Sequence, residues 1–392
     1  MRNSPMTDYL SKKIKILSFL AIVMVVLVHA YNQPERVLHS WKLVKTGENW
    51  NAWAQLFISN GVARYGIPFF FLVSGWLNYR KARGAFADLA LTRLRTLALP
   101  YFLWSAISLF VFWLAQQNDF MWALMQANPI GPFATTRLAD YSASQWWTRS
   151  VVYPVAFQLW FLRDLFVCSL LAPLLIAAFA LPRALVALMF AGFAVLFFNG
   201  ADFYLVEGEG LLFFSAGLLL AHCGADVQQA PRWFRLRWWA VLWLAVIALK
   251  TGLAFAHWDV SRPLAIIALY RLSQVMGIAV VWFGYDRVMR GAAPAPAALR
   301  MASHAFIVYV LHVPLLNLAT QAALTLFGNT DAMRFAVYAG SAAGSIGVCV
   351  LAGRAMTRWA PTLSALLTGG RATPPPSTPT PATPQQLTSE TV

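Results

Sequence analysis

Long apolar runs separated by short polar connections recur along the chain as far as about residue 357. Most of these runs are close to 20 residues long, the length that an α-helix needs to cross the hydrocarbon core of a bilayer. The pattern therefore predicts an all-α, polytopic membrane protein with about ten transmembrane helices. The expected spans are 14–31, 61–79, 97–116, 153–179, 183–199, 204–222, 237–256, 262–284, 302–325 and 334–356.

The same pattern divides the chain into three parts. Residues 1–13 precede the first apolar run and are expected to form a cytoplasmic N-terminus, and residues 14–357 form one transmembrane domain. Residues 358–392 are expected to form a cytoplasmic tail. The tail should be disordered from about residue 369, because Pro, Thr and Ser dominate there and no apolar period remains.

The composition supports a location in the membrane and decides how the charge is interpreted. Apolar residues make up 59% of the 392 residues and charged residues only 11%, too few to cover the surface of a soluble protein of this size. The net charge of +15 would suggest nucleic-acid binding in a soluble protein. Here the cations lie in short connections, so the positive-inside rule predicts that these connections and both termini are cytoplasmic.

Glycines and cysteines indicate packing rather than chemistry. Gly340 and Gly344 form a small-xxx-small pattern, which predicts close packing of that helix against a neighbour. The cysteines, Cys168, Cys223 and Cys349, lie in or beside apolar runs without the spacing of metal ligands. We therefore expect no metal site.

Several ionisable side chains fall where the expected topology places the outer half of the membrane. Such groups are costly in hydrocarbon, so each is a candidate for function. Because they come from several helices, together they predict an enclosed polar cavity. The group consists of His29, Arg163, Asp164, Glu207, Glu209, Arg271 and His312.

Plainer interpretations remain open for the individual members of this group. Arg163 and Asp164 are sequence neighbours that project in different directions, so one of them could form a structural ion pair with Glu207 or another acid. Glu207 and Glu209 could mark no more than a solvated helix entrance. His312 could be a hydrogen-bonded packing residue. The cluster carries more weight than any single member.

His29 is the member with the clearest chemistry. It follows an almost uniformly apolar run, near the outer end of the first expected helix, where a lone histidine could also simply extend to the headgroup region. A neutral imidazole can accept a proton from a hydroxyl group at physiological pH. A general base in a cavity that opens outward indicates chemistry on a molecule that arrives from outside.

Six segments together resemble the integral-membrane acyltransferase family often called acyltransferase-3, in order from about residue 13 to residue 357. The resemblance implies a protein of about ten helices, in a bacterial inner membrane, that moves an acyl group, commonly acetyl. The donor would be cytoplasmic acyl-coenzyme A, and the acceptor a hydroxyl of a glycan or lipid-linked sugar on the outer side. The segments are KIKILSFLAIVMVVLVHAYN, PFFFLVSGWLNYRKARG, TRLRTLALPYFLWS, LWFLRDLFVCSLLAPLL, FFSAGLLLAH and SHAFIVYVLHVPLL.

The resemblance also implies roles for single residues. His29 matches the central catalytic histidine of the family, and Arg93 and Arg95 match basic residues ahead of the PYFLW element. We expect Lys15, Arg93 and Arg95 to bind the phosphates of coenzyme A. Arg163 would position the acceptor or stabilise the developing oxyanion. Acyl-coenzyme A is a substrate, and no tightly bound cofactor is expected.

One position departs from the family pattern. The family usually has an arginine eleven residues before the catalytic histidine, and this chain has Ser18 there. Eleven residues are about three helical turns, so Ser18 and His29 share a helix face and lie roughly 16 Å apart. Lys15, one turn earlier, is the expected replacement for the missing guanidinium.

Two other function classes remain open from the sequence. A transporter or flippase of a small or lipid-linked molecule could use the same polar cavity without chemistry, although helix breaks are weak and no internal repeat is present. A non-catalytic interaction protein that keeps the fold is also compatible with the Ser18 departure. The identity of the acceptor and the length of the acyl chain are not fixed by the sequence.

Overall fold

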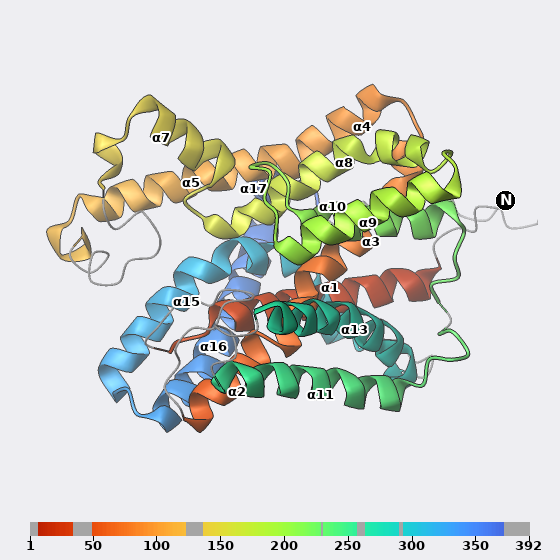
Figure 1. Ribbon diagram of the computed structural model, residues 1–392. Coiled ribbons are helices and arrows are strands. Elements are labelled where there is room, and N and C mark those ends of the chain that lie inside the picture. The colour runs from red at the N-terminus through yellow and green to blue at the C-terminus, as the bar shows by residue number, and fades with distance from the viewer. Residues whose placement is uncertain are drawn as a thin grey trace, which may run out of the picture.

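Helices account for nearly all of the regular structure, as the computed structural model of the chain shows (Figure 1). The structure describes residues 7–33, 49–122, 136–228, 230–256, 263–289 and 293–371. Within these residues the sole β-type pairing is an isolated bridge between Asp202 and Glu207. The predicted all-α fold is confirmed.

The helices follow one another in chain order, and in two places a short helical turn joins one helix directly to the next. Val62–Tyr65 is a 3₁₀ turn (η1) that joins α2 to α3, and Leu94–Ala98 is a π-helical turn (η2) that joins α4 to α5. The helices are α1 (Asp8–His29), α2 (Trp50–Ser59), α3 (Gly66–Ala82), α4 (Phe86–Arg93), α5 (Leu99–Gln116), α7 (Ala143–Trp147), α8 (Trp160–Ala178), α9 (Arg183–Asn199), α10 (Gly208–His222), α11 (Leu236–Phe255), α13 (Pro263–Met289), α14 (Pro296–Ala302), α15 (Ala305–Phe327), α16 (Asp331–Trp359) and α17 (Pro361–Thr368).

Seven helical stretches of the described chain are long and apolar enough to cross a membrane. The helices α9 and α10 are apolar but shorter, and α1, with 22 residues, is not among the seven. The polytopic architecture is therefore confirmed, whereas the count of about ten spans is not. The seven stretches are Trp50–Ala82, Phe86–Gln116, Phe157–Ala178, Leu236–Phe255, Leu264–Met289, Ala305–Phe327 and Asp331–Trp359.

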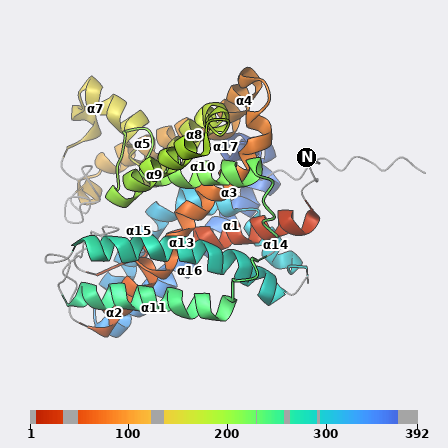
Figure 2. The same ribbon diagram turned by 45° about the vertical axis from the view of Figure 1, so that its right-hand side comes forward.

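The first helix lies in the interior of the bundle. Figures 1 and 2 show α1 (red) between the group formed by α8, α9 and α10 and the pair formed by α11 and α13. Its start is fixed by the Thr7 side chain, which accepts a hydrogen bond from the backbone N–H of Leu10. One turn later Lys13 is fully buried, pairs with Asp286 of α13 at 2.6 Å, and lies 4.0 Å from the Trp282 ring centroid. These contacts hold the charged end of α1 against α13.

Two glycines bring α3 and α10 into backbone contact. A Cβ atom added to Gly75 would lie 2.0 Å from the carbonyl oxygen of Phe214, and one added to Gly217 would lie 2.0 Å from that of Leu72. Among the described residues the prediction of close packing at Gly340 and Gly344 is wrong, because a Cβ added at either position would have none of their atoms within 4 Å. The periodic pattern was present, but its face of α16 is exposed in the described chain.

The segment after α16 folds back onto the bundle. The helix α17 packs against α5, and the indole N–H of Trp104 donates to the carbonyl oxygen of Leu367 at 2.9 Å. Gly369 has a positive φ of 61° and lies so close to Thr96 that an added Cβ would be 2.6 Å from its carbonyl oxygen. The expected tail thus begins with a packed helix, and the described chain continues to residue 371. Residues 372–392 lie outside the described residues.

Candidate active site

One stripe of α1 contributes to the walls of two cavities. Ser18, Ile22, Val25 and His29 are spaced by four, three and four residues, so they lie on one face of the helix. Ser18 and Ile22 line a cavity of about 330 Å³, and Val25 and His29 line a second cavity of about 350 Å³. The first is called the arginine cavity below, after Arg93 and Arg371 in its wall, and the second the histidine cavity.

The histidine cavity gathers residues from five parts of the sequence. His29 is partly exposed, as expected for a side chain in its wall. Four of the residues expected in the polar cluster share this cavity, namely His29, Glu207, Glu209 and Arg271. Other polar residues in its wall are Arg64, Asp202, Tyr270 and Gln274. The cavity therefore offers carboxylate acceptors, guanidinium donors and an imidazole to a single ligand.

The His29 ring lies against a second histidine. The ring centroids of His29 and His312 are 5.3 Å apart, and the Phe157 ring lies 5.1 Å from His29 on another side. Nδ1 of His312 is 2.8 Å from the carbonyl oxygen of Tyr309 and 3.0 Å from that of Val308. Both partners only accept, so Nδ1 carries the proton and donates. Nε2 of His312 is buried and has no hydrogen-bond partner in the described chain.

A buried ion pair supports one wall of the histidine cavity. Nη1 of Arg271 lies 3.2 Å from a carboxylate oxygen of Glu209, and the side chain of Gln274 contacts both, at 3.3 Å. The Arg271 guanidinium also lies 4.3 Å from the centroid of the Phe197 ring. The Glu209 carboxylate therefore has partners, which excludes the plainer interpretation of this residue as part of a solvated helix entrance.

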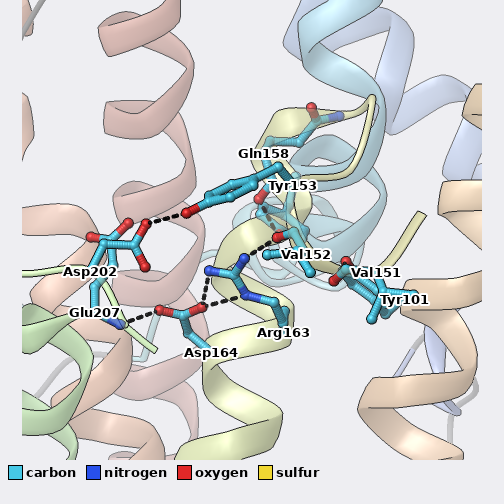
Figure 3. A network of polar contacts seen from close by, with 10 residues as sticks. Tyr101, Val151, Val152, Tyr153, Gln158, Arg163, Asp164, Asp202 and Glu207 are labelled. Carbon is cyan, nitrogen blue, oxygen red and sulfur yellow. Dashed lines mark hydrogen bonds and ion pairs between the residues drawn. The ribbon is translucent and has the colours of Figure 1, made fainter. Parts of the chain in front are cut away.

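Arg163 and Asp164 form a separate polar network beside this cavity (Figure 3). Nε and Nη2 of Arg163 donate to one oxygen of Asp164 at 2.9 and 2.7 Å, and both side chains are buried. The other Asp164 oxygen accepts from the backbone N–H of Glu207 at 2.8 Å, and Nη1 of Arg163 donates to the carbonyl oxygen of Val152. The pair thereby joins α8 to the start of α10 and to the segment before α8.

This pairing corrects the expectation that Arg163 and Asp164 point apart. Adjacent helical positions do diverge by about 100°, but the long arginine side chain folds back so that its guanidinium meets the neighbouring carboxylate. Neither residue is among the described residues that line the two cavities. The role expected for Arg163, positioning an acceptor or stabilising an oxyanion, stays a prediction.

The arginine cavity contains a second set of polar groups. Arg93 donates to the side-chain oxygen of Asn78, and Arg371 donates to the carbonyl oxygen of Thr368 at 2.9 Å. Both guanidinium groups line the cavity together with the Ser18 position on α1. Lys15 and Arg95, the other residues expected to bind the donor, are exposed and are not among the described residues that line this cavity.

Several polar lining residues were absent from the predicted set, among them Arg64, Gln274 and Arg371. Arg64 and Gln274 could have been found by the criterion applied to Arg271, since both are polar residues in or beside long apolar runs. Arg371 could not, because it follows Gly369 and Gly370 at the start of a segment rich in Pro and Thr, where sequence alone indicates disorder.

The fold and the site define an integral-membrane enzyme class: a polytopic helical protein in which a histidine faces a polar cavity and a second, cationic cavity lies on the same helix face. The chain belongs to the family described as "Acyltransferase domain", whose model matches residues 12–354. It is therefore a membrane acyltransferase that transfers groups other than aminoacyl groups. This assignment favours the enzyme over the transporter and the non-catalytic alternatives.

A curated relative extends the comparison to nearly the whole chain. The succinoglycan biosynthesis protein ExoH of Rhizobium meliloti (strain 1021) is 26% identical over 378 residues, which cover 93% of this chain and 95% of that protein. No solved structure matches the chain.

Proposed function

We propose that this protein moves an acyl group, most simply acetyl, from acyl-coenzyme A to a hydroxyl group of a glycan. The observation that carries the proposal is the α1 stripe, on which His29 faces one cavity and Ser18 faces the other. A transferase that binds its two substrates at the same time needs a separate place for each and a catalytic group beside the acceptor. Family membership supplies the reaction class, and the ExoH relative, named for succinoglycan biosynthesis, supports a glycan as acceptor.

His29 is the group that we assign to proton transfer. The acceptor hydroxyl would give its proton to the imidazole while its oxygen attacks the thioester carbonyl carbon. A C–O bond then forms and the C–S bond breaks, so the sulfur leaves as a thiolate. The imidazolium returns the proton to that sulfur, and the products are the glycan ester and free coenzyme A. A thioester is already activated, so this step needs no metal ion or redox cofactor.

The histidine cavity is suited to a sugar because its polar groups are of both kinds. Sugar hydroxyls donate to carboxylates and accept from guanidinium and amide N–H groups. Glu207, Arg64 and Gln274 supply such partners in the wall that also holds His29. We therefore assign the acceptor to this cavity.

The arginine cavity is suited to the donor. Of the residues expected to bind the donor, Arg93 lines this cavity. Guanidinium groups bind phosphate oxygens in a bidentate manner. Arg93 belongs to one of the basic connections that the positive-inside rule places in the cytoplasm. We therefore expect the arginine cavity to face the cytoplasm of a bacterial inner membrane, where acyl-coenzyme A is found. The thioester arm would then extend along α1 from Ser18 towards His29, over roughly 16 Å.

The proposal is tested with the purified full-length chain in lipid vesicles. Release of free coenzyme A from acetyl-coenzyme A is measured with and without an oligosaccharide acceptor, and ester formation on the acceptor is followed by mass spectrometry. The His29→Ala variant should lose on the order of a hundred- to ten-thousandfold in turnover, the usual contribution of a general base. His222→Ala is the matched control, since His222 lies at the exposed end of α10, where it contacts Tyr79 and Phe179, and it lines neither cavity.

Two results would count against this assignment. Near-native turnover by His29→Ala, with unchanged insertion and unfolding temperature, would remove His29 from the mechanism. Failure of the wild-type chain to release coenzyme A with any acyl donor, from acetyl to longer chains, would overturn the donor assignment.

A further inference from the structure

The wall of the arginine cavity contains two guanidinium groups and no acidic residue among the described residues that form it. Arg93 comes from the end of α4 and Arg371 from the turn after α17, so two distant parts of the chain deliver like charges to one space. Neither forms an ion pair with a described acidic residue. Two cations that share a partly desolvated wall repel each other, and an anion between them would remove that cost.

Arg371 is held in this place by specific contacts of the turn that carries it. The hydrogen bond from Trp104 to Leu367 and the close approach of Gly369 to Thr96 anchor the turn that carries it. Its guanidinium lies 4.7 Å from the centroid of the Phe306 ring. Arg371 is nonetheless an exposed residue, as expected for a position in the wall of an open cavity.

The charge of Arg371 is maintained at neutral pH. The surrounding protein atoms displace water, and this effect together with the smaller effect of the nearby Arg93 charge lowers the pKa of Arg371 to about 10. A group with this pKa is still protonated at pH 7. One Nη atom is bonded to Thr368, and the guanidinium has further N–H groups to donate to a ligand.

We propose that Arg371, together with Arg93, forms an anion site that binds the phosphate groups of the donor, and that Arg371 supplies the cation that Ser18 does not. The identity of the ligand rests on the proposed function, whereas the anion site itself does not. Arg371, and not Lys15, fills this role because Arg371 lines the same cavity as Ser18, and Lys15 is exposed elsewhere.

The test measures binding to the purified full-length chain by calorimetry, with coenzyme A, inorganic pyrophosphate and phosphate-free pantetheine as probes. Arg371→Ala should weaken coenzyme A and pyrophosphate binding by roughly 10- to 100-fold, which corresponds to the loss of a charge-assisted hydrogen bond. Pantetheine binding should not change. Arg371→Lys should recover only part of the loss, because an ammonium lacks the planar fork.

A second substitution, made in the Arg371→Ala background, provides the most discriminating comparison. Ser18 lines the same cavity, so Ser18→Arg in the Arg371→Ala background should restore a large part of the affinity for coenzyme A. Arg358→Ala is the matched control, since it removes an exposed cation that is not in this wall. This control should change binding by no more than about twofold, in line with screened surface charges.

The outcomes separate this proposal from the proposed function. If the wild type transfers acyl groups but Arg371→Ala binds coenzyme A as Arg358→Ala does, or loses pantetheine binding equally, the anion site is overturned and the enzyme assignment stands. If the wild type binds pyrophosphate through Arg371 but uses no acyl-coenzyme A, the anion site stands and the donor is wrong. If it binds neither pyrophosphate nor coenzyme A, both are overturned.

Discussion

The imidazole rings of His29 and His312 lie 5.3 Å apart between centroids, although one belongs to α1 and the other to α15. The proton of His312 is fixed on Nδ1 by two backbone carbonyl groups, which leaves Nε2 as a buried acceptor with no partner in the described chain. A buried acceptor without a partner costs about 1–3 kcal/mol. A donor from His29 or from a bound substrate would remove that cost.

His312→Asn tests whether this acceptor assists catalysis. An asparagine amide can still donate to the carbonyl groups that bind Nδ1, but it has no atom in place of Nε2. We expect the unfolding temperature to stay near that of the wild type and the turnover number to fall roughly 2- to 10-fold, the value of one neutral hydrogen bond. Thr320→Ala, which removes a polar group elsewhere on α15, is the control for activity. Unchanged turnover in His312→Asn would reduce His312 to a packing residue.

Arg93 and Arg95 are expected to differ, although they lie two residues apart. Arg93 lines the arginine cavity and bonds Asn78, whereas Arg95 is exposed in the π-helical turn. Arg93→Ala should raise KM for acyl-coenzyme A by roughly 10- to 100-fold, because a charged hydrogen bond to phosphate is lost. Arg95→Ala should change it by less than about threefold. Steady-state kinetics against donor concentration decides, and equal effects would contradict the cavity assignment.

The buried pair of Arg163 and Asp164 should contribute to stability. Asp164→Ala leaves the guanidinium buried without its carboxylate and removes the acceptor of the Glu207 N–H, which should lower the free energy of unfolding by about 3–5 kcal/mol. Asp202→Ala is the matched control, because its contact with Tyr153 is exposed and should be worth at most about 1 kcal/mol. Thermal unfolding in detergent compares the two variants. Equal unfolding temperatures would show that the pair is not structural.

The glycine contact between α3 and α10 gives a prediction of steric cost. Gly75→Ala places a methyl group against the backbone of Phe214, and overpacking of this kind should cost about 1–3 kcal/mol or more. Gly340→Ala meets no neighbouring atom within 4 Å, so it should be neutral or stabilise the helix by up to about 1 kcal/mol. Thermal unfolding of the two alanine variants provides the comparison. The order would be reversed if α16, rather than α10, made the close contact.

The fold class was predictable because apolar length is a local property of the sequence. Each expected span from 14–31 to 334–356 overlaps a helix of the structure, although the short helices α9 and α10 show that apolarity alone does not fix a span. The contacts between helices were harder to predict from the sequence. Gly340 and Gly344 have the small-xxx-small spacing, but the contact occurs at Gly75 and Gly217, because spacing does not reveal which helix face has a neighbour.

The sequence predicted those members of the candidate site that are ionisable and fall within expected membrane spans. Glu209 and Arg271 were expected in one cavity with His29 and are found there. Their partners were not predictable, because an ion pair depends on side-chain direction as well as depth. Arg163 illustrates this, since its guanidinium reaches the adjacent Asp164. Arg371 could not be predicted for a different reason, because its position depends on a packed helix that follows the last expected span.

The stripe on α1 has a consequence for the order of events in a catalytic cycle. Because Ser18 and His29 face different cavities, an occupant of one cavity need not depart before the other is filled. Two bound substrates that meet at one helix face form a ternary complex. Double-reciprocal plots of initial rate against donor concentration, measured at several acceptor concentrations, should then give intersecting lines. A mechanism in which the first product must leave before the second substrate enters gives parallel lines.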